Sequence, residues 1–107
     1  MSDPSPPRRR PTQPLLDQLG SDIVAGKDAA AFLWNVPDDV ATRTKMVDLL
    51  RKIRDGSAAQ GRSEMPRLCE ELLLAVRAQP TPQQVDILQD GFDRLYKLWA
   101  AAKSGLF

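Results

Sequence analysis

Apolar residues between positions 15 and 105 recur every three or four residues. This is the spacing of helices that bury one face. No segment alternates between apolar and polar residues over the length of a half-buried strand. We therefore expect an all-α fold, and the short breaks between the periodic segments favour an antiparallel four-helix bundle.

The first periodic segment predicts a short N-terminal helix over about residues 12–25. Gly26 then stands where helices often end on a glycine. Residues 29–34 could add a turn or two before Pro37, whose ring disfavours helical backbone at Val36. The expected apolar stripe is Leu15, Leu16, Leu19, Ile23 and Val24.

Two further helices are expected after Pro37. The first starts near Pro37 or Asp38, whose carboxylate can accept hydrogen bonds from free amides together with Asp39 in the first turn, and runs to about Asp55. The next covers about residues 63–79. The expected core residues are Met46, Leu49, Leu50 and Ile53, with Val40 upstream, and then Met65, Leu68, Cys69, Leu72 and Val76.

The last helix has the clearest start in the chain. Thr81 precedes Pro82 and is followed three residues later by Gln84, which is the pattern of a capping box with proline at the first helical position. The buried stripe of this helix is expected to be Val85, Leu88, Phe92, Leu95, Trp99 and Ala102.

Residues 1–14 differ in composition from the rest of the chain. They hold five prolines, three consecutive arginines and no large apolar side chain after Met1. Such a segment cannot bury enough surface to offset its ordering entropy. We expect a disordered, solubilising arm ahead of a single helical domain, residues 15–105, although the proline spacing is also that of a polyproline ligand.

Composition excludes several classes of function. The 107 residues hold 15 basic and 14 acidic side chains, so the whole chain has no net field that favours nucleic acid or an anionic membrane. With one cysteine and no histidine, the chain can form neither an internal disulfide, nor a Cys-rich zinc site, nor a thiolate–imidazole catalytic pair. We therefore expect a non-enzymatic cytoplasmic protein without a cofactor, a metal, a membrane span or a secretory signal.

Two short sequences carry a resemblance. "KIRDGSAA", residues 52–59, is followed by "RLCEELL", residues 67–73. Together they resemble bacterial histidine phosphotransfer (HPt) domains, which are four-helix bundles with a motif like His-x-x-Lys-Gly-Ser-Ala-Ala inside one long helix. The likeness extends over roughly residues 38–102. Lys52 occupies the place of the phosphorylated histidine, Asp55 occupies that of the usual lysine, and one residue is missing between Gly56 and Cys69.

The resemblance implies a pseudo-HPt adaptor that binds receiver or kinase domains in two-component signalling without accepting phosphate. A lysine ammonium has no free lone pair with which to attack a phosphoryl group, and no histidine can replace it. Gly56 would let a partner approach, and the cations beside it would face the acidic pocket of a receiver. The expected partner-binding residues are Arg51, Lys52, Arg54, Asp55, Gly56 and Ser57.

Each of these features also has a simpler interpretation. Residues 56–61 can be an ordinary interhelical loop, Lys52 a solvated surface charge, and Cys69 a small core side chain. Trp34 and Trp99 are expected in the core more than at an interface, and residues 106–107 can pack back or engage a partner.

A second hypothesis is a structural or scaffolding bundle. It would associate with itself or with another helical protein through the helix that spans residues 85–102. Leu74, Ile87 and Leu98 lie off the main apolar stripes, as such an association requires.

Overall fold

The computed structural model describes residues 13–61 and 63–105. These residues form four helices, namely α1 (Gln13–Asn35), α2 (Val40–Ala58), α3 (Glu64–Arg77) and α4 (Pro82–Lys103). None of the described residues lies in a strand, so the predicted all-α bundle is confirmed. The expected arm at residues 1–12 and the terminal pair 106–107 lie outside the described residues, whereas residues 13 and 14 belong to α1.

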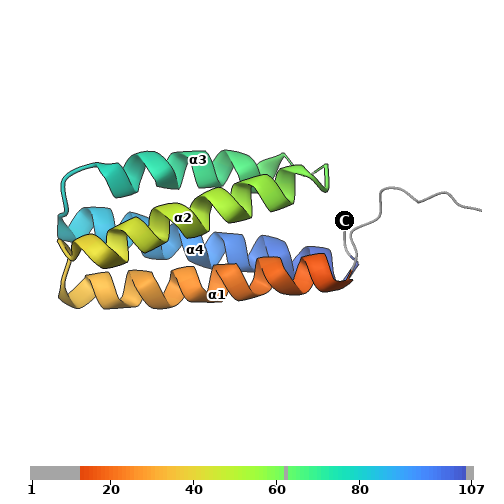
Figure 1. Cartoon of the computed structure of the whole chain (residues 1–107), viewed down its shortest axis with the longest axis horizontal. Helices are drawn as coiled ribbons and strands as arrows, with labels where there is room; N and C mark the ends of the chain where they lie inside the picture. The colour runs from red at the N-terminus through yellow and green to blue at the C-terminus, as the bar shows by residue number, and fades with distance from the viewer. Residues whose placement is uncertain (1–12, 62, 106–107) are drawn as a thin grey trace, which may run out of the picture.

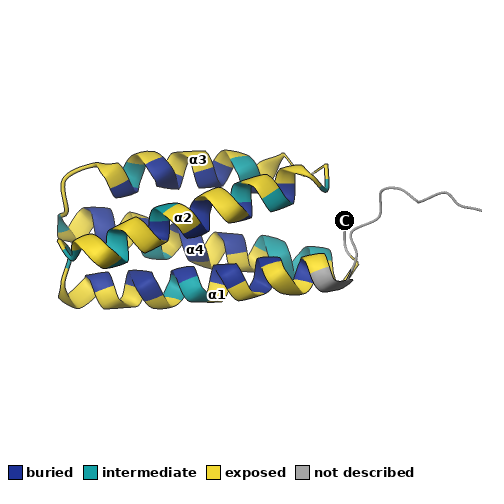
Figure 2. Cartoon of the chain, in the orientation of Figure 1, coloured by how far each residue is buried: buried dark blue, intermediate teal, exposed yellow. Residues whose placement is uncertain are grey.

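Consecutive helices run in opposite directions and lie side by side (Figure 1). Each helix packs against two others: α1 against α2 and α4, and α3 against the same two. The bundle is therefore a four-cornered arrangement in which α2 and α4 occupy opposite corners. One face of every helix points into the centre and is buried (Figure 2).

The core contains the leucine, isoleucine and methionine positions that the helical spacing predicts. The largest fully buried side chains include Phe92, Ile23, Leu33, Met46 and Leu50. The predicted stripes are wrong at Val40, which is 75% exposed, and at Val24 and Leu15; the expected core position of Trp34 is also wrong, since this residue is 52% exposed. Trp34 lies near the end of α1 and Val40 is the first residue of α2, whereas Leu15 and Val24 lie on the exposed side of α1.

The N-terminal helix is long, contrary to the prediction of a short one. It continues through Gly26 to Asn35, and Gly26 is a packing position in its middle. The aromatic ring of Phe92 lies against this glycine, so that a Cβ atom there would sit 2.0 Å from Phe92 Cε1. A larger residue at position 26 would clash with Phe92 of α4, and the helix does not end there.

The first turn of α2 is capped by Asp39, the second of the two expected carboxylates, and the helix begins at Val40. The Thr42 backbone N–H donates to Asp39 Oδ2 at 2.9 Å, and the Thr42 hydroxyl donates to the same oxygen at 2.6 Å. These two hydrogen bonds stabilise the charged carboxylate and hold the pKa of Asp39 below its usual value.

The far end of α2 decides between the two interpretations of "GSAA". The helix continues to Ala58, so Gly56 and Ser57 are helical, and the connection to α3 begins only at Ala59. Gly61 has a φ of 76° and provides the left-handed residue of this turn. The loop interpretation is therefore wrong for residues 56–58.

The start of α4 and the end of α3 share one hydrogen-bond network. Thr81 caps α4 as predicted, because its hydroxyl oxygen accepts from the Gln84 backbone N–H at 3.1 Å. The Gln84 side chain, however, does not return to Thr81, since its amide donates to the carbonyls of Ala75 and Ala78 at the end of α3.

Arg43 of α2 completes this network. Its guanidinium donates to Gln84 Oε1 at 2.8 Å, to the Ala78 carbonyl at 2.9 Å and to the Val76 carbonyl. It also donates to the Pro37 carbonyl at 3.1 Å. One side chain thus joins both interhelical turns at this end of the bundle and supplies positive charge to the C-terminus of α3, where it is favourable.

Candidate functional site on helix α2

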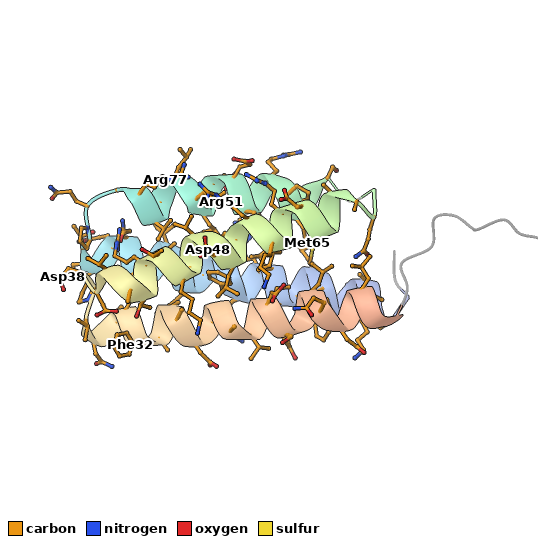
Figure 3. The ribbon with its side chains drawn as sticks, in the orientation of Figure 1. Phe32, Asp38, Asp48, Arg51, Met65 and Arg77 are labelled. Carbon is orange, nitrogen blue, oxygen red and sulfur yellow. The ribbon has the colours of Figure 1, made fainter. Side chains whose placement is uncertain are left out.

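The candidate site is the last two turns of α2, which carry the residues singled out from the sequence. Ile53 and Ser57 face the core, while Arg51, Lys52 and Asp55 are exposed. Figure 3 labels Arg51 and Asp48 on α2. The exposed side of this helix carries both signs of charge, since Asp48 and Asp55 lie one turn from the two cations.

Lys52 leans toward α1. Its Nζ lies 4.0 Å from Asp22 Oδ1, and the Lys52 side chain is 62% exposed whereas the Asp22 side chain is only 9% exposed. The same carboxylate oxygen accepts a hydrogen bond from Gln18 Nε2 at 3.0 Å. The Lys52 ammonium therefore has only a long ion pair with Asp22 on the α1 side, and its other side is exposed to solvent.

Arg54 points the other way, toward α3. Its Nε donates to Asp55 Oδ1 at 3.0 Å, and its Nη1 donates to Glu70 Oε2 at 3.1 Å. The hydrogen bond to Asp55, followed by the weaker contribution of Glu70, raises the pKa of Arg54. Arg54 is thus paired with two carboxylates. Of the three cations expected at the site, only Arg51 and Lys52 are exposed and not paired in this way.

Gly56 is half-buried at the edge between α2 and α1. A Cβ atom at this position would lie 3.2 Å from Leu19 Cδ2, which is a close contact with the end of a flexible side chain. Lys52 and Gly56 are four residues apart in one helix and therefore lie on the same side of α2. The missing side chain at Gly56 leaves room for Leu19 in the seam between α1 and α2.

Ser57 is fully buried, unlike the other residues of the predicted site. Its hydroxyl donates to the Ile53 carbonyl at 2.7 Å and lies 3.1 Å from the Arg54 carbonyl oxygen. The hydroxyl is satisfied within its own helix, and the structure therefore places Ser57 in the core and not on the binding face.

Cys69 lies in α3 beneath the site and is completely buried. Burial raises the pKa of the Cys69 thiol to about 12, because the thiolate would lose its hydration. A thiol of this kind is not an activated nucleophile, and the core interpretation of Cys69 is confirmed. Among the described residues, no group of three or more potential metal ligands is found.

Asp22 and Gln18 are part of this site although the sequence did not single them out. The available signal was the position of Asp22 beside Ile23 and three residues after Leu19, where an apolar residue would continue the stripe. An acidic residue on the buried side of a helix is rare unless it has a partner. Gln18 and Lys52 are those partners.

No family model matches the chain, and comparisons with curated proteins and with solved structures give no match. The likeness to HPt domains therefore stands on the two quoted sequences and the helix order. No helix among residues 13–61 and 63–105 combines the length and apolar character that crossing a membrane requires.

Proposed function

We propose that this chain is a non-catalytic, HPt-like binding module that engages a receiver or kinase domain through the exposed side of α2. The observation that carries the proposal is the continuity of α2 through "KIRDGSAA". Because the helix is continuous, the exposed Lys52 lies one turn from Gly56 on the same side of α2. In the family that the motif resembles, this is the place of the phosphate-accepting side chain.

The Lys52 ammonium is suited to a non-covalent ion pair with carboxylates of a partner protein. A receiver domain presents a cluster of carboxylates, to which an ammonium can bind without any covalent step. Asp22 lies 4.0 Å away and provides only a weak competing partner, so the Lys52 ammonium can reorient toward a second carboxylate. The module would occupy the docking surface of its partner and leave the phosphoryl group where it is.

The test combines binding with phosphotransfer. Receiver and kinase domains encoded in the same genome are titrated with the full chain, and each receiver is also phosphorylated by its kinase in the presence of the chain. The proposal expects at least one receiver to bind, with no phosphate on this chain. Failure of every receiver and kinase domain to bind, or acid-labile phosphate on the chain, would contradict the proposal.

A second candidate function is self-association of a scaffolding bundle, and the distribution of exposed apolar side chains favours a surface for it. The stripe of α4 at Val85, Leu88, Phe92 and Leu95 is buried within the bundle, and Leu98 packs against the core. Ile87 on α4 and Leu74 on α3 are 54% and 70% exposed, as the sequence indicated, and four more large apolar residues are exposed where α1 passes into α2. They are Phe32, Trp34, Val36 and Val40.

Sedimentation of the full chain and of Trp34→Glu over a range of concentrations tests this alternative. Self-association through the α1–α2 end predicts a dimer or larger species that Trp34→Glu returns to a monomer. A monomer at all concentrations, for both proteins, contradicts it.

A further inference from the structure

Asp22 of α1 carries a buried charge beside the proposed binding surface. Its side chain is 9% exposed, and among the described residues it is the only charged one in the buried set, which otherwise contains the polar residues Ser57 and Gln84. Its neighbours on the buried face of α1 are Leu19 and Ile23, both in the core. A carboxylate that loses its hydration in this way requires compensation from nearby groups.

The compensation at Asp22 comes from two side chains on one oxygen. Gln18 Nε2 donates to Asp22 Oδ1 at 3.0 Å from one turn earlier in the same helix, and this donor is neutral. Lys52 Nζ of α2 lies 4.0 Å from the same oxygen. No second cation lies within 4 Å of Asp22 in the described part of the chain. Lys52 is therefore the one positive charge beside this buried carboxylate.

The two ends of this ion pair differ in how much water reaches them. The Lys52 side chain is 62% exposed, so its ammonium can turn away from α1 and exchange one carboxylate for another. Asp22 cannot follow, since α1 is packed against α2 and α4, and little water reaches its carboxylate to replace the ammonium. Taking the cation away from a buried carboxylate is unfavourable, more so than separating two exposed charges. Binding of a partner at Lys52 therefore carries a cost that arises at Asp22.

We propose that Asp22 positions the Lys52 ammonium toward α1 in the unbound protein and thereby limits the affinity of α2 for an acidic partner. This inference rests on the proposed function, because it concerns the contact that Lys52 makes with a receiver or kinase domain. The coupling is reciprocal, so a partner that engages Lys52 must also weaken the contact between Lys52 and Asp22. Asp22 is thus a built-in competitor for the ammonium that the partner binds.

The first experiment is a double-mutant cycle of binding. The wild type, Asp22→Asn, Lys52→Gln and the double variant are each titrated against the receiver or kinase domain that binds the full chain. Asparagine keeps the size of Asp22 and can still accept the hydrogen bond from Gln18, and thermal melts verify that each variant is folded. Asp22→Asn should bind roughly two- to fivefold more tightly than the wild type, which is the range expected for an ion pair with one exposed member.

Two controls separate this effect from a general change of charge. In the Lys52→Gln background, Asp22→Asn should leave the affinity unchanged, because the competition acts only through the ammonium. Asp28→Asn makes the same change of charge on α1, at an exposed residue with no cation within 4 Å among the described residues, and should also leave the affinity unchanged.

A spectroscopic measurement on the wild type tests the same contact without a substitution at Asp22. Binding of the partner should move the carboxyl carbon resonance of Asp22 toward its position in unbound Lys52→Gln, because both conditions remove the ammonium. The carboxyl carbon of Asp28 should not move.

The outcomes distinguish this inference from the proposed function. An Asp22→Asn affinity equal to or weaker than that of the wild type would overturn the inference while the binding function stands. A gain that persists in the Lys52→Gln background, or an Asp22 resonance that does not respond to the partner, would also overturn the inference alone. Failure of the wild type and of Asp22→Asn to bind any receiver or kinase domain would contradict both, whereas binding by Asp22→Asn alone would support the inference.

Discussion

Three glycines inside helices each accommodate a large side chain of a neighbouring helix. A Cβ atom would lie 2.4 Å from Trp99 Cζ2 at Gly20, 2.0 Å from Phe92 Cε1 at Gly26, and 2.2 Å from Leu72 Cδ2 at Gly91. Glycine has a low helix propensity, but at each of these positions its missing side chain lets two helices approach closely. Together they set the position of α4 along its neighbours α1 and α3.

Gly26→Ala and Gly56→Ala make a matched pair of helical substitutions with opposite expected results. Alanine favours a helix by about 1 kcal/mol over glycine, so Gly56→Ala should be neutral or stabilising up to that amount, since only the end of Leu19 must move. Gly26→Ala forces Phe92 out of place and should lower the free energy of unfolding by about 1–3 kcal/mol. Urea denaturation measures both, and a Gly26→Ala protein as stable as the wild type would contradict the packing described.

The buried thiol predicts a particular dependence of stability on pH. The pKa of Cys69 is about 12 in the folded chain, against a reference value of 9.0, so the unfolded state loses its proton first. The contribution of Cys69 to stability is complete below pH 9 and falls as the pH rises from there toward 12. The free energy of unfolding should therefore decline more steeply between pH 8 and 10.5 in the wild type than in Cys69→Ala. Parallel slopes would contradict the burial of the thiol.

At the residue scale, spacing along the chain was sufficient to predict most of the buried leucines and Cys69, but not Leu33 and Leu73. It was not sufficient for Gly26, because the ring that requires a glycine there belongs to Phe92, far away in the sequence. It also failed at Val40 and Trp34, since an apolar residue near a helix end satisfies the period whether or not a neighbouring helix covers it.

At the scale of the helices, the network at the end of α3 is the main polar connection between elements. Arg43 from α2 and Gln84 from α4 supply donors to the carbonyls of Ala75, Val76 and Ala78. The last turn of a helix lacks the following amides that would satisfy its carbonyls, and here the Ala75 carbonyl accepts the Ala78 backbone N–H at 3.1 Å in addition to Gln84.

Arg43→Met tests how much this network contributes. The substitution keeps an apolar stem and removes the donors, which leaves carbonyls and Gln84 Oε1 without a charged partner. We expect the free energy of unfolding to fall by about 2–3 kcal/mol. Arg51→Met, an exposed arginine on the same helix, should change it by less than about 0.5 kcal/mol. Equal thermal melts for the two variants would show that the network contributes nothing.

The residues that start a helix were easier to predict than the contacts that the helix makes with its neighbours. Thr81, Pro82 and Gln84 identify the start of α4 because capping depends on neighbours in sequence. The Gln84 side chain instead reaches the end of α3, and that partner depends on the tertiary fold. The length of α1 was mispredicted for the same reason. Gly26 was interpreted as a helix end, but it lies in the middle of α1 and contacts Phe92 of α4.

At the scale of the molecule, the bundle presents α2 as a continuous helix with Lys52 at its open side. The exposure of Arg51 and Lys52 followed from the helical period. The neutralisation of Arg54 did not, because Glu70 is on α3, and the burial of Ser57 places one expected binding residue in the core. The proposed surface is therefore narrower than the sequence indicated, and it centres on Lys52, with Gly56 one turn away on the same side of α2.

The central claim is that Lys52 makes the contact with an acidic partner. Lys52→Glu and Lys97→Glu carry the same change of charge, and Lys97 is an exposed residue of α4, at the corner of the bundle opposite α2. Thermal melts of the two variants serve as the folding control.

Titration of wild type, Lys52→Glu and Lys97→Glu against the receiver or kinase domain that binds the full chain is the most direct measurement. Placing like charges together at an interface can cost several kcal/mol, so Lys52→Glu should weaken binding at least about tenfold. Lys97→Glu should leave the affinity within about twofold of the wild type, since a solvated charge far from the interface contributes little. Equal affinities for all three proteins, or an equal loss in both variants, would contradict the assignment of the binding surface to α2.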